Sequence, residues 1–146
     1  EWNTCGTTST EAISLGCVME PLVYGWMPPQ CLFPELTNLY PIFETKIWYT
    51  DQNHTEVVPR EDLWAGKHYH IYTERYHTEH CVFQWRKLQY AMHSRKEWLD
   101  NKTTNWEHTT HCADLISSKG YARQADGDGS KNSAGLGFYI CKKTIW

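Results

Sequence analysis

Two stretches of the chain carry apolar residues at the spacing of an α-helix. Residues three or four positions apart share one face of a helix. Counted from His77 and from His108, the residues on these faces are Cys81, Trp85, Leu88 and Met92 in the first stretch, and Cys112, Leu115 and Ile116 in the second. We therefore expect two amphipathic helices, over about residues 74–93 and 105–119.

The residues at the ends of both stretches are of the types that begin and end helices. Thr73 stands before the first stretch as its expected N-cap. Thr104 and Glu107 have capping-box spacing before the second stretch, and Gly120 follows it as a stop signal. We expect these two helices to be central to the fold and roughly antiparallel.

The other expected elements are short, because proline and glycine interrupt the hydrophobic runs. They are a short helix from the capping box at 8–11 to Gly16, an irregular segment at 24–34, a helix at 35–40 after Pro34, a hairpin of 46–50 with 55–59, helical turns at 60–65, a strand at 68–72, a flexible surface loop at 126–135 and a strand at 138–141. The predicted fold class is mainly α with short β-strands, a small α+β fold, in a single domain over residues 1–146.

Composition favours a folded protein that does not bind nucleic acid. Eight Trp, nine Tyr and four Phe exclude a disordered chain. The formal net charge is −3 and the basic residues are scattered, so we expect no nucleic-acid partner. No apolar run approaches the roughly 20 residues that cross a bilayer. The chain begins at Glu1 rather than Met, so we expect that residues upstream have been removed and that any signal peptide or membrane anchor stood there.

Cysteines and glycosylation sequons indicate the secretory pathway. An even number of cysteines suits three disulfides in an oxidising compartment, with connectivity left open. The cysteines are Cys5, Cys17, Cys31, Cys81, Cys112 and Cys141. Asn53 and Asn101 each begin an Asn-x-Thr sequon and are the expected glycosylation sites. We therefore expect a lumenal or extracellular protein.

The pentamer His-x-x-His-Cys occurs twice, as HTEHC at 77–81 and as HTTHC at 108–112. Each copy falls on the apolar face of its predicted helix, near the N-terminal end. If the helices pack through these faces, four imidazoles meet. One buried histidine is usually a hydrogen-bonded core residue, but four together are unfavourable when unpaired and repel one another when protonated. A divalent metal removes both problems, because neutral imidazoles donate lone pairs to it.

The predicted metal ligands are therefore His77, His80, His108 and His111. His68 and His70 alternate on the strand before the first helix, so they are either further ligands or ordinary edge-strand residues. An imidazole-rich site suits copper or zinc, and the spacing does not match the zinc-peptidase motifs. The two pentamer cysteines are either thiolate ligands or disulfide partners, and disulfides suit the expected compartment better.

Several stretches resemble the UstYa-like (DUF3328) family of fungal proteins, which is defined by two His-x-x-His-Cys motifs. The similar stretches are CGTTSTEAISLGC, YGWMPPQC, YHTEHCVFQWRK and NWEHTTHC, within residues 4–115. The resemblance implies a lumenal domain behind an N-terminal membrane anchor, in an uncharacterised branch of the family. It also implies copper-dependent oxidation in secondary-metabolite biosynthesis, with the four pentamer histidines as ligands.

Three functions remain open from the sequence. The first is a copper-dependent oxidase with one or two ions, using O2 on a peptide or small molecule for oxidative cyclisation, hydroxylation or desaturation. The second is a secreted, non-catalytic binding or effector module stapled by metal and disulfides. A zinc hydrolase ranks last, because no general base stands at motif spacing. An open coordination position would favour catalysis over a structural role.

Overall fold

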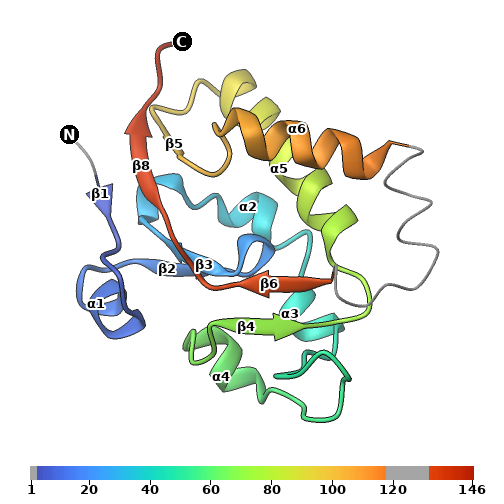
Figure 1. Cartoon of the computed structure of the whole chain (residues 1–146). Helices are drawn as coiled ribbons and strands as arrows, with labels where there is room; N and C mark the ends of the chain where they lie inside the picture. Colours follow the sequence, from blue (N-terminus) through green and yellow to red (C-terminus); the bar gives the residue numbers. More distant parts are fainter. Residues whose placement is uncertain (1–2, 118–131) are drawn as a thin grey trace.

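Short helices and strands alternate in the computed structural model, which describes residues 3–117 and 132–146 (Figure 1). The helices are α1 (Ser9–Ser14), α2 (Pro34–Thr37), α3 (Ile42–Thr45), α4 (Arg60–Trp64), α5 (His77–His93) and α6 (Trp106–Ile116), with 3-10 turns η1 (Pro21–Val23) and η2 (Pro29–Cys31). The strands are β1 (Asn3–Thr4), β2 (Val18–Glu20), β3 (Gly25–Met27), β4 (His70–Tyr72), β5 (Trp98–Asp100), β6 (Ser133–Gly135), β7 (Gly137–Phe138) and β8 (Ile140–Lys143). The predicted small α+β fold class is confirmed.

The strands form three small sheets among the described residues, and the C-terminal segment contributes to each of them. β8 lies between β1 and β5 and is antiparallel to both. β3 pairs antiparallel with β2 and parallel with β7, while β4 pairs antiparallel with β6. The last residues of the chain are therefore fastened to segments from its beginning and its middle.

Aromatic rings fill much of the core. Trp48 packs edge-on against Phe43, at 6.1 Å between ring centroids, and against Tyr76, at 5.4 Å. Tyr24 also packs edge-on against Phe43, with 6.2 Å between the ring centroids. Such edge-to-face pairs add to the hydrophobic stabilisation from burial. Tyr76 is the residue before α5, so this core fixes the point at which that helix begins.

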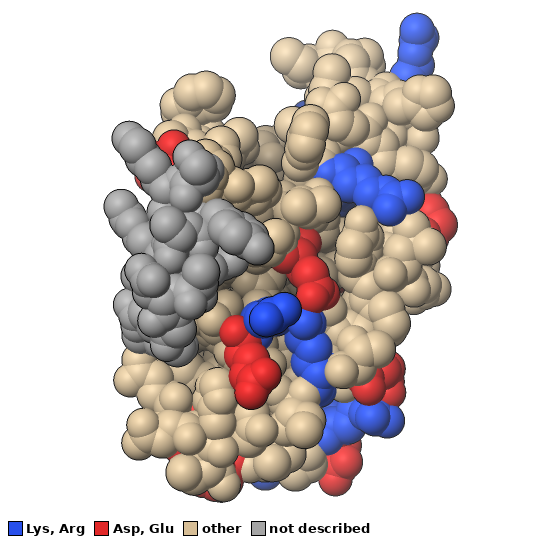
Figure 2. Space-filling model, turned by 90° about the vertical axis from the view of Figure 1, so that its right-hand side faces the viewer, with Lys and Arg blue, Asp and Glu red and all other residues tan. Residues whose placement is uncertain are grey.

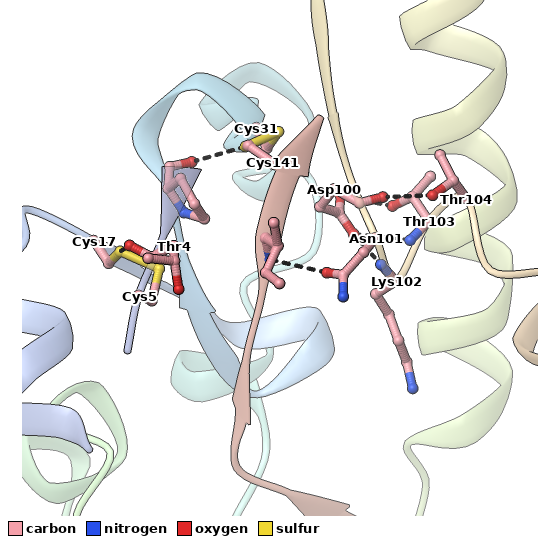
Figure 3. The surroundings of a disulfide bond; sticks show 12 residues. Thr4, Cys5, Cys17, Cys31, Asp100, Asn101, Lys102, Thr103, Thr104 and Cys141 are labelled. Atoms are coloured by element: carbon pink, nitrogen blue, oxygen red, sulfur yellow. Dashed lines mark hydrogen bonds between the residues drawn. A yellow bond between two sulfur atoms is a disulfide. The ribbon is translucent and has the colours of Figure 1, made fainter. Parts of the chain in front are cut away.

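Three disulfides use all six cysteines, as the sequence predicts. Cys5 pairs with Cys17 across α1, and Cys31 pairs with Cys141, which joins η2 to β8 (Figure 3). The third bond, Cys81–Cys112, joins the N-terminal part of α5 to the middle of α6. The sequence left the disulfide connectivity open. The structure has one bond within the N-terminal segment, one between distant segments and one between the two pentamers.

Both long helices begin later than the sequence predicts. Thr73 is not the N-cap of α5: its hydroxyl donates to the Ile47 carbonyl, and the helix starts at His77. The cap of α6 is Asn105, whose side chain accepts from the His108 backbone N–H at 2.7 Å. Thr104 instead donates to the Asp100 carbonyl. The predicted stop at Gly120 lies outside the described residues, and α6 is described as far as Ile116.

The buried face of α5 differs from the predicted apolar face. Trp85 is 67% exposed and Met92 is 47% exposed, so neither belongs to the core. Phe83, Lys87 and Ala91 are buried instead. The predicted face was wrong because the buried face is centred on the other side of His77, where Lys87 is buried in an ion pair with Asp100.

Three predictions about the short helices are confirmed. Thr8 caps α1, Pro34 begins α2, and helical turns form at Arg60–Trp64. The irregular segment at 24–34 contains strand β3, and residues 133–135 of the predicted flexible loop form strand β6. Residues 126–131 of that loop lie outside the described part. The expected hairpin is reduced to a bridge between Tyr49 and Val57.

Charged groups of both signs lie close together on the face shown in Figure 2. Lys46 pairs with Glu79 at 2.7 Å, and Arg60 pairs with Glu44 at 2.8 Å. The expected absence of a nucleic-acid partner stays a prediction. Over residues 3–117 and 132–146, the helices are too short or too polar to span a bilayer.

Candidate metal centre

The first turns of α5 and α6 bring the two pentamers into contact. The Nε2 atoms of His80 and His108 lie 2.9 Å apart, and their ring centroids are 4.9 Å apart. The rings of His77 and His111 face each other more loosely, at 6.3 Å between centroids. The ligand atoms of His80, His108 and Cys112 all lie within 4.8 Å of one another. The rings of the four predicted histidines therefore lie next to one another, and His80 and His108 are closest. His77 and His111 do not belong to the group of ligand atoms that lie within 4.8 Å of one another in the described part of the chain.

The surroundings of His80 fix its tautomer. Its Nδ1 contacts the Leu22 carbonyl oxygen and lies 3.2 Å from the Tyr76 hydroxyl, which itself donates to Leu22 at 2.9 Å. A carbonyl oxygen can only accept, so Nδ1 carries the proton. The lone pair of the neutral ring is therefore on Nε2, which points at His108. A hydrogen bond of this kind from the second nitrogen orients many metal-bound histidines.

Three of the imidazoles, those of His77, His80 and His108, have lowered pKa values and are neutral at physiological pH. Burial lowers the pKa of His80 to about 3, against the opposing effect of the hydrogen bond to Leu22, and the nearby ring of His108 and the charge of Lys102 lower it further. Burial lowers the pKa of His77 to about 4, with a smaller effect of His111, and lowers that of His108 to about 4, with Lys102 and His111 contributing. Neutral imidazole is the form that binds metal ions.

His77 and His111 form the more open side of the cluster. His77 is half-buried, and its Nδ1 has no hydrogen-bond partner within the described part of the chain. His111 is exposed. An unpartnered, buried ring nitrogen is unfavourable unless water or an ion satisfies it. A cation or a water molecule bound beside His77 would satisfy this ring nitrogen.

The disulfide Cys81–Cys112 lies directly under the imidazoles. Cys112 Sγ is 3.7 Å from His108 Nε2, but the sulfur is bonded to Cys81. A thiolate is the form of cysteine that ligates metals, so in this oxidised state the imidazoles are the available donors. The bond holds α5 and α6 at a fixed separation and preorganises the histidines.

A buried ion pair lies on the same face of α5 as His80, two turns further along the helix. Lys87 Nζ lies 2.7 Å from Asp100 Oδ2, and both side chains are fully buried. Asp100 also accepts from the backbone N–H groups of Thr103 and Lys102, at 2.8 and 3.0 Å. These bonds shape the loop that leads into α6. The sequence offered no signal for this pair, because Lys87 and Asp100 are distant in the chain and of ordinary surface types.

His68 and His70 are not brought to the cluster. His70 lies on β4 opposite Gly135 and is exposed. His68 Nε2 lies 3.9 Å from Asp62 Oδ2. The structure therefore places them where the sequence's alternative put them, as residues at and beside strand β4 and away from the paired rings. Tyr76, which flanks the first pentamer four positions before His80, was expected from the sequence to be solvated or to cap the helix; it is instead buried against His80.

The two sequons differ in surroundings. Asn53 is exposed in the turn at 51–54, and Thr55 of the same sequon donates to Asp51. Asn101 is half-buried, and its side-chain oxygen accepts from the Ile140 N–H at 2.9 Å (Figure 3). Glycosylation at either site stays a prediction.

Known proteins are similar to this chain over most of its length. Two relatives are "Phomopsin biosynthesis cluster protein B" and "Phomopsin biosynthesis cluster protein B'" of Diaporthe leptostromiformis, each 32% identical over 125 residues. The match covers 79% of this chain and 36% of each relative, so the chain spans about a third of their length. No protein-family profile matches the chain, and no solved structure matches it.

The fold and the cluster define a class: disulfide-stapled α+β proteins in which two helices present paired His-x-x-His-Cys motifs to each other. Within that class, the chain is similar to the two phomopsin cluster proteins, and its paired His-x-x-His-Cys motifs resemble those of the UstYa-like (DUF3328) family. Its three disulfides suit an oxidising secretory or extracellular compartment.

Proposed function

We propose that this protein is a copper-dependent oxidase of a fungal secondary-metabolite pathway, acting on a peptide or a small molecule. The observation that carries the proposal is the pair of ring nitrogens of His80 and His108, 2.9 Å apart with the lone pair of His80 directed at His108. The relatives support the pathway, since both are named as phomopsin biosynthesis cluster proteins.

The separation of these nitrogens fits two neighbouring ligands of one ion. Two bonds of about 2.05 Å at right angles span about 2.9 Å, whereas a tetrahedral angle requires about 3.3 Å. The same separation also fits a hydrogen bond between the two rings, so the choice of copper, as one or two ions, rests on the imidazole-rich donor set and on the resemblance to the family.

His80 and His108 would hold the metal, with His77 and His111 completing the set on the open side. Copper, when bound, supplies one-electron redox steps that let dioxygen accept electrons from the substrate. Cyclisation and desaturation each remove two electrons and two protons from the substrate, which reduce O2 to hydrogen peroxide. Hydroxylation requires two further electrons from an added reductant.

The protein's own residues then have three tasks. The Leu22 carbonyl and the Tyr76 hydroxyl hold Nδ1 of His80, so that its lone pair stays directed at the site. The Cys81–Cys112 bond keeps the helices apart at a constant distance. The buried surroundings disfavour protonation of the ligands, which would otherwise compete with the metal.

Metal content and oxygen consumption test the proposal. Native protein should contain copper, and copper-loaded protein should consume dioxygen when the pathway's peptide is supplied. His108→Ala should lose both properties, while the exposed, remote His93→Ala should retain them. Zinc as the native metal, without oxygen consumption, would contradict the proposal.

The second candidate, a non-catalytic binding module, is favoured by one observation. Trp106 is 78% exposed and Trp85 is 67% exposed near the start of α6 and on α5, and exposed tryptophans often belong to interaction surfaces. A closed metal site with four protein ligands and no exchangeable water would favour this alternative. Location in the secretory pathway lumen, with an anchor upstream of residue 1, belongs to either proposal.

A further inference from the structure

A cavity of about 340 Å³ lies between α5 and α6, directly beside the imidazole cluster. Trp85 and Leu88 of α5 and Ala113 and Ile116 of α6 contribute apolar walls, and His108 borders it. Trp85 and Ile116 are 67% and 41% exposed, so a ligand in the cavity would cover apolar surface that now faces solvent. A volume near 300 Å³ is at the small end for ligand pockets and suits a single ring system.

One of the residues that line the cavity, Gln84, has a side-chain amide with an unused hydrogen-bonding atom among the described residues. Gln84 lines the cavity and is only 6% exposed, and one atom of its amide has no partner among the described residues. The other atom of the amide lies 2.8 Å from Thr103 Oγ1. A buried amide in this state is unfavourable until a ligand or water completes it.

The partners of Thr103 decide which amide atom is free. Thr103 Oγ1 also lies 2.8 Å from Asp100 Oδ2, and the ionised carboxylate of the Lys87–Asp100 pair can only accept. The single hydroxyl proton therefore goes to Asp100. The Asp100 carboxylate, the Thr103 hydroxyl and the Gln84 amide are then compatible in one orientation of the amide. In that orientation Gln84 Nε2 donates to Thr103 Oγ1, and the Gln84 carbonyl oxygen is left free.

We propose that this cavity binds an uncharged, ring-sized apolar group that carries one N–H or O–H donor, with Gln84 as the residue that accepts from that donor. Charged ligands are disfavoured, because apart from His108 the described lining residues carry no titratable side chain. As His108 borders the cavity, a group bound there lies next to the proposed metal. Its role as a substrate subsite rests on the proposed function, whereas the binding itself does not.

Two bicyclic probes of nearly identical shape test the assignment. Indole has an N–H donor, and benzofuran has an oxygen in its place. In metal-free protein with chelator present, calorimetric titration should show indole binding about threefold to tenfold more tightly, the difference expected for one neutral hydrogen bond. Because no metal is present, a failed oxidase assay would not affect this result.

Two substitutions separate the hydrogen bond from the apolar cavity. Gln84→Met keeps a similar volume without an acceptor, so both probes should bind with nearly equal affinity. Ala113→Trp fills the cavity from an exposed position on α6 and should weaken both probes at least tenfold. Gln89→Trp, at an exposed position of α5 outside the cavity lining, is the matched control and should change neither.

The outcomes are distinct. Equal binding of the two probes to the unmodified protein, or tighter binding of benzofuran, would overturn the role of Gln84. Binding of indole that survives Ala113→Trp unchanged would overturn the location, and this holds even if Gln84→Met does not fold.

Discussion

At the scale of single residues, the candidate site depends on groups that are buried and paired. Lys87 and Asp100 are both fully buried, 2.7 Å apart. Removing one partner leaves an uncompensated buried charge, which typically costs about 3–5 kcal/mol. Asp100 also accepts hydrogen bonds from Thr103 and Lys102, which offset part of the cost of burying its charge.

Lys87→Met should therefore lower the free energy of unfolding by about 3–5 kcal/mol in urea titration. The control is Lys96→Met, since Lys96 lies 3.5 Å from Glu35 in a partly exposed pair that should contribute less than about 1 kcal/mol. Similar losses in the two variants would show that Lys87 is not held in the buried pair.

The lowered pKa values of the cluster predict how stability depends on pH in metal-free protein. In the unfolded chain a histidine titrates near 6.5, whereas the pKa is about 3 for His80 and about 4 for His77 and His108 in the fold. As pH falls below about 6.5, the unfolded chain binds protons that the folded chain does not. The free energy of unfolding should keep its full value above that pH. It should fall toward pH 4, by up to about 1.4 kcal/mol per pH unit for each such group.

Chelator-treated protein, unfolded in urea at a series of pH values from 7 to 4, gives this slope. His80→Gln should reduce the slope by nearly one proton, and His93→Gln should leave it unchanged. A slope that is the same in His80→Gln and in the unmodified protein would contradict the buried, neutral state of His80.

At the scale of elements, the sequence predicted the long helices but not where they begin. The two pentamers could be placed on helices, because His-x-x-His-Cys spacing and the apolar residues repeat at the helical period. The starts were missed because Thr73 and Thr104 have N-cap chemistry, yet both hydroxyls bind other carbonyls. Contacts such as His80 with Leu22, or Gln84 with Thr103, join distant segments and leave no local pattern.

Substitution of the observed cap tests the corrected start of α6. Asn105→Ala removes the acceptor for the His108 N–H and should destabilise the protein by about 0.5–2 kcal/mol. Thr104→Ala, at the position that the sequence favoured, should have a clearly smaller effect. Thermal or urea unfolding measures both, and a larger loss from Thr104→Ala would contradict the assignment of the cap.

At the scale of the whole molecule, the C-terminal strands and the disulfides hold together segments that are far apart in sequence. Cys31–Cys141 has a sequence separation of 110, whereas Cys5–Cys17 has one of 12. In the chain-entropy description, a crosslink that closes a longer loop removes more entropy from the unfolded chain. The first bond should therefore stabilise the fold more than the second.

Replacing both cysteines of a bond by alanine compares the two loops. Loss of Cys31–Cys141 should lower the free energy of unfolding by about 2 kcal/mol more than loss of Cys5–Cys17. Equal losses, measured in denaturant under the same conditions, would show that the long loop is already constrained in the unfolded chain.

The central claim is that His80 and His108 jointly bind one copper ion. Pulsed electron paramagnetic resonance of protein loaded with one equivalent of Cu(II) measures the nitrogen couplings of bound imidazoles directly. We predict couplings from at least two imidazoles, with one lost in His108→Ala and none lost in His93→Ala. Couplings from one imidazole only, or a spectrum that His108→Ala does not change, would contradict the shared site.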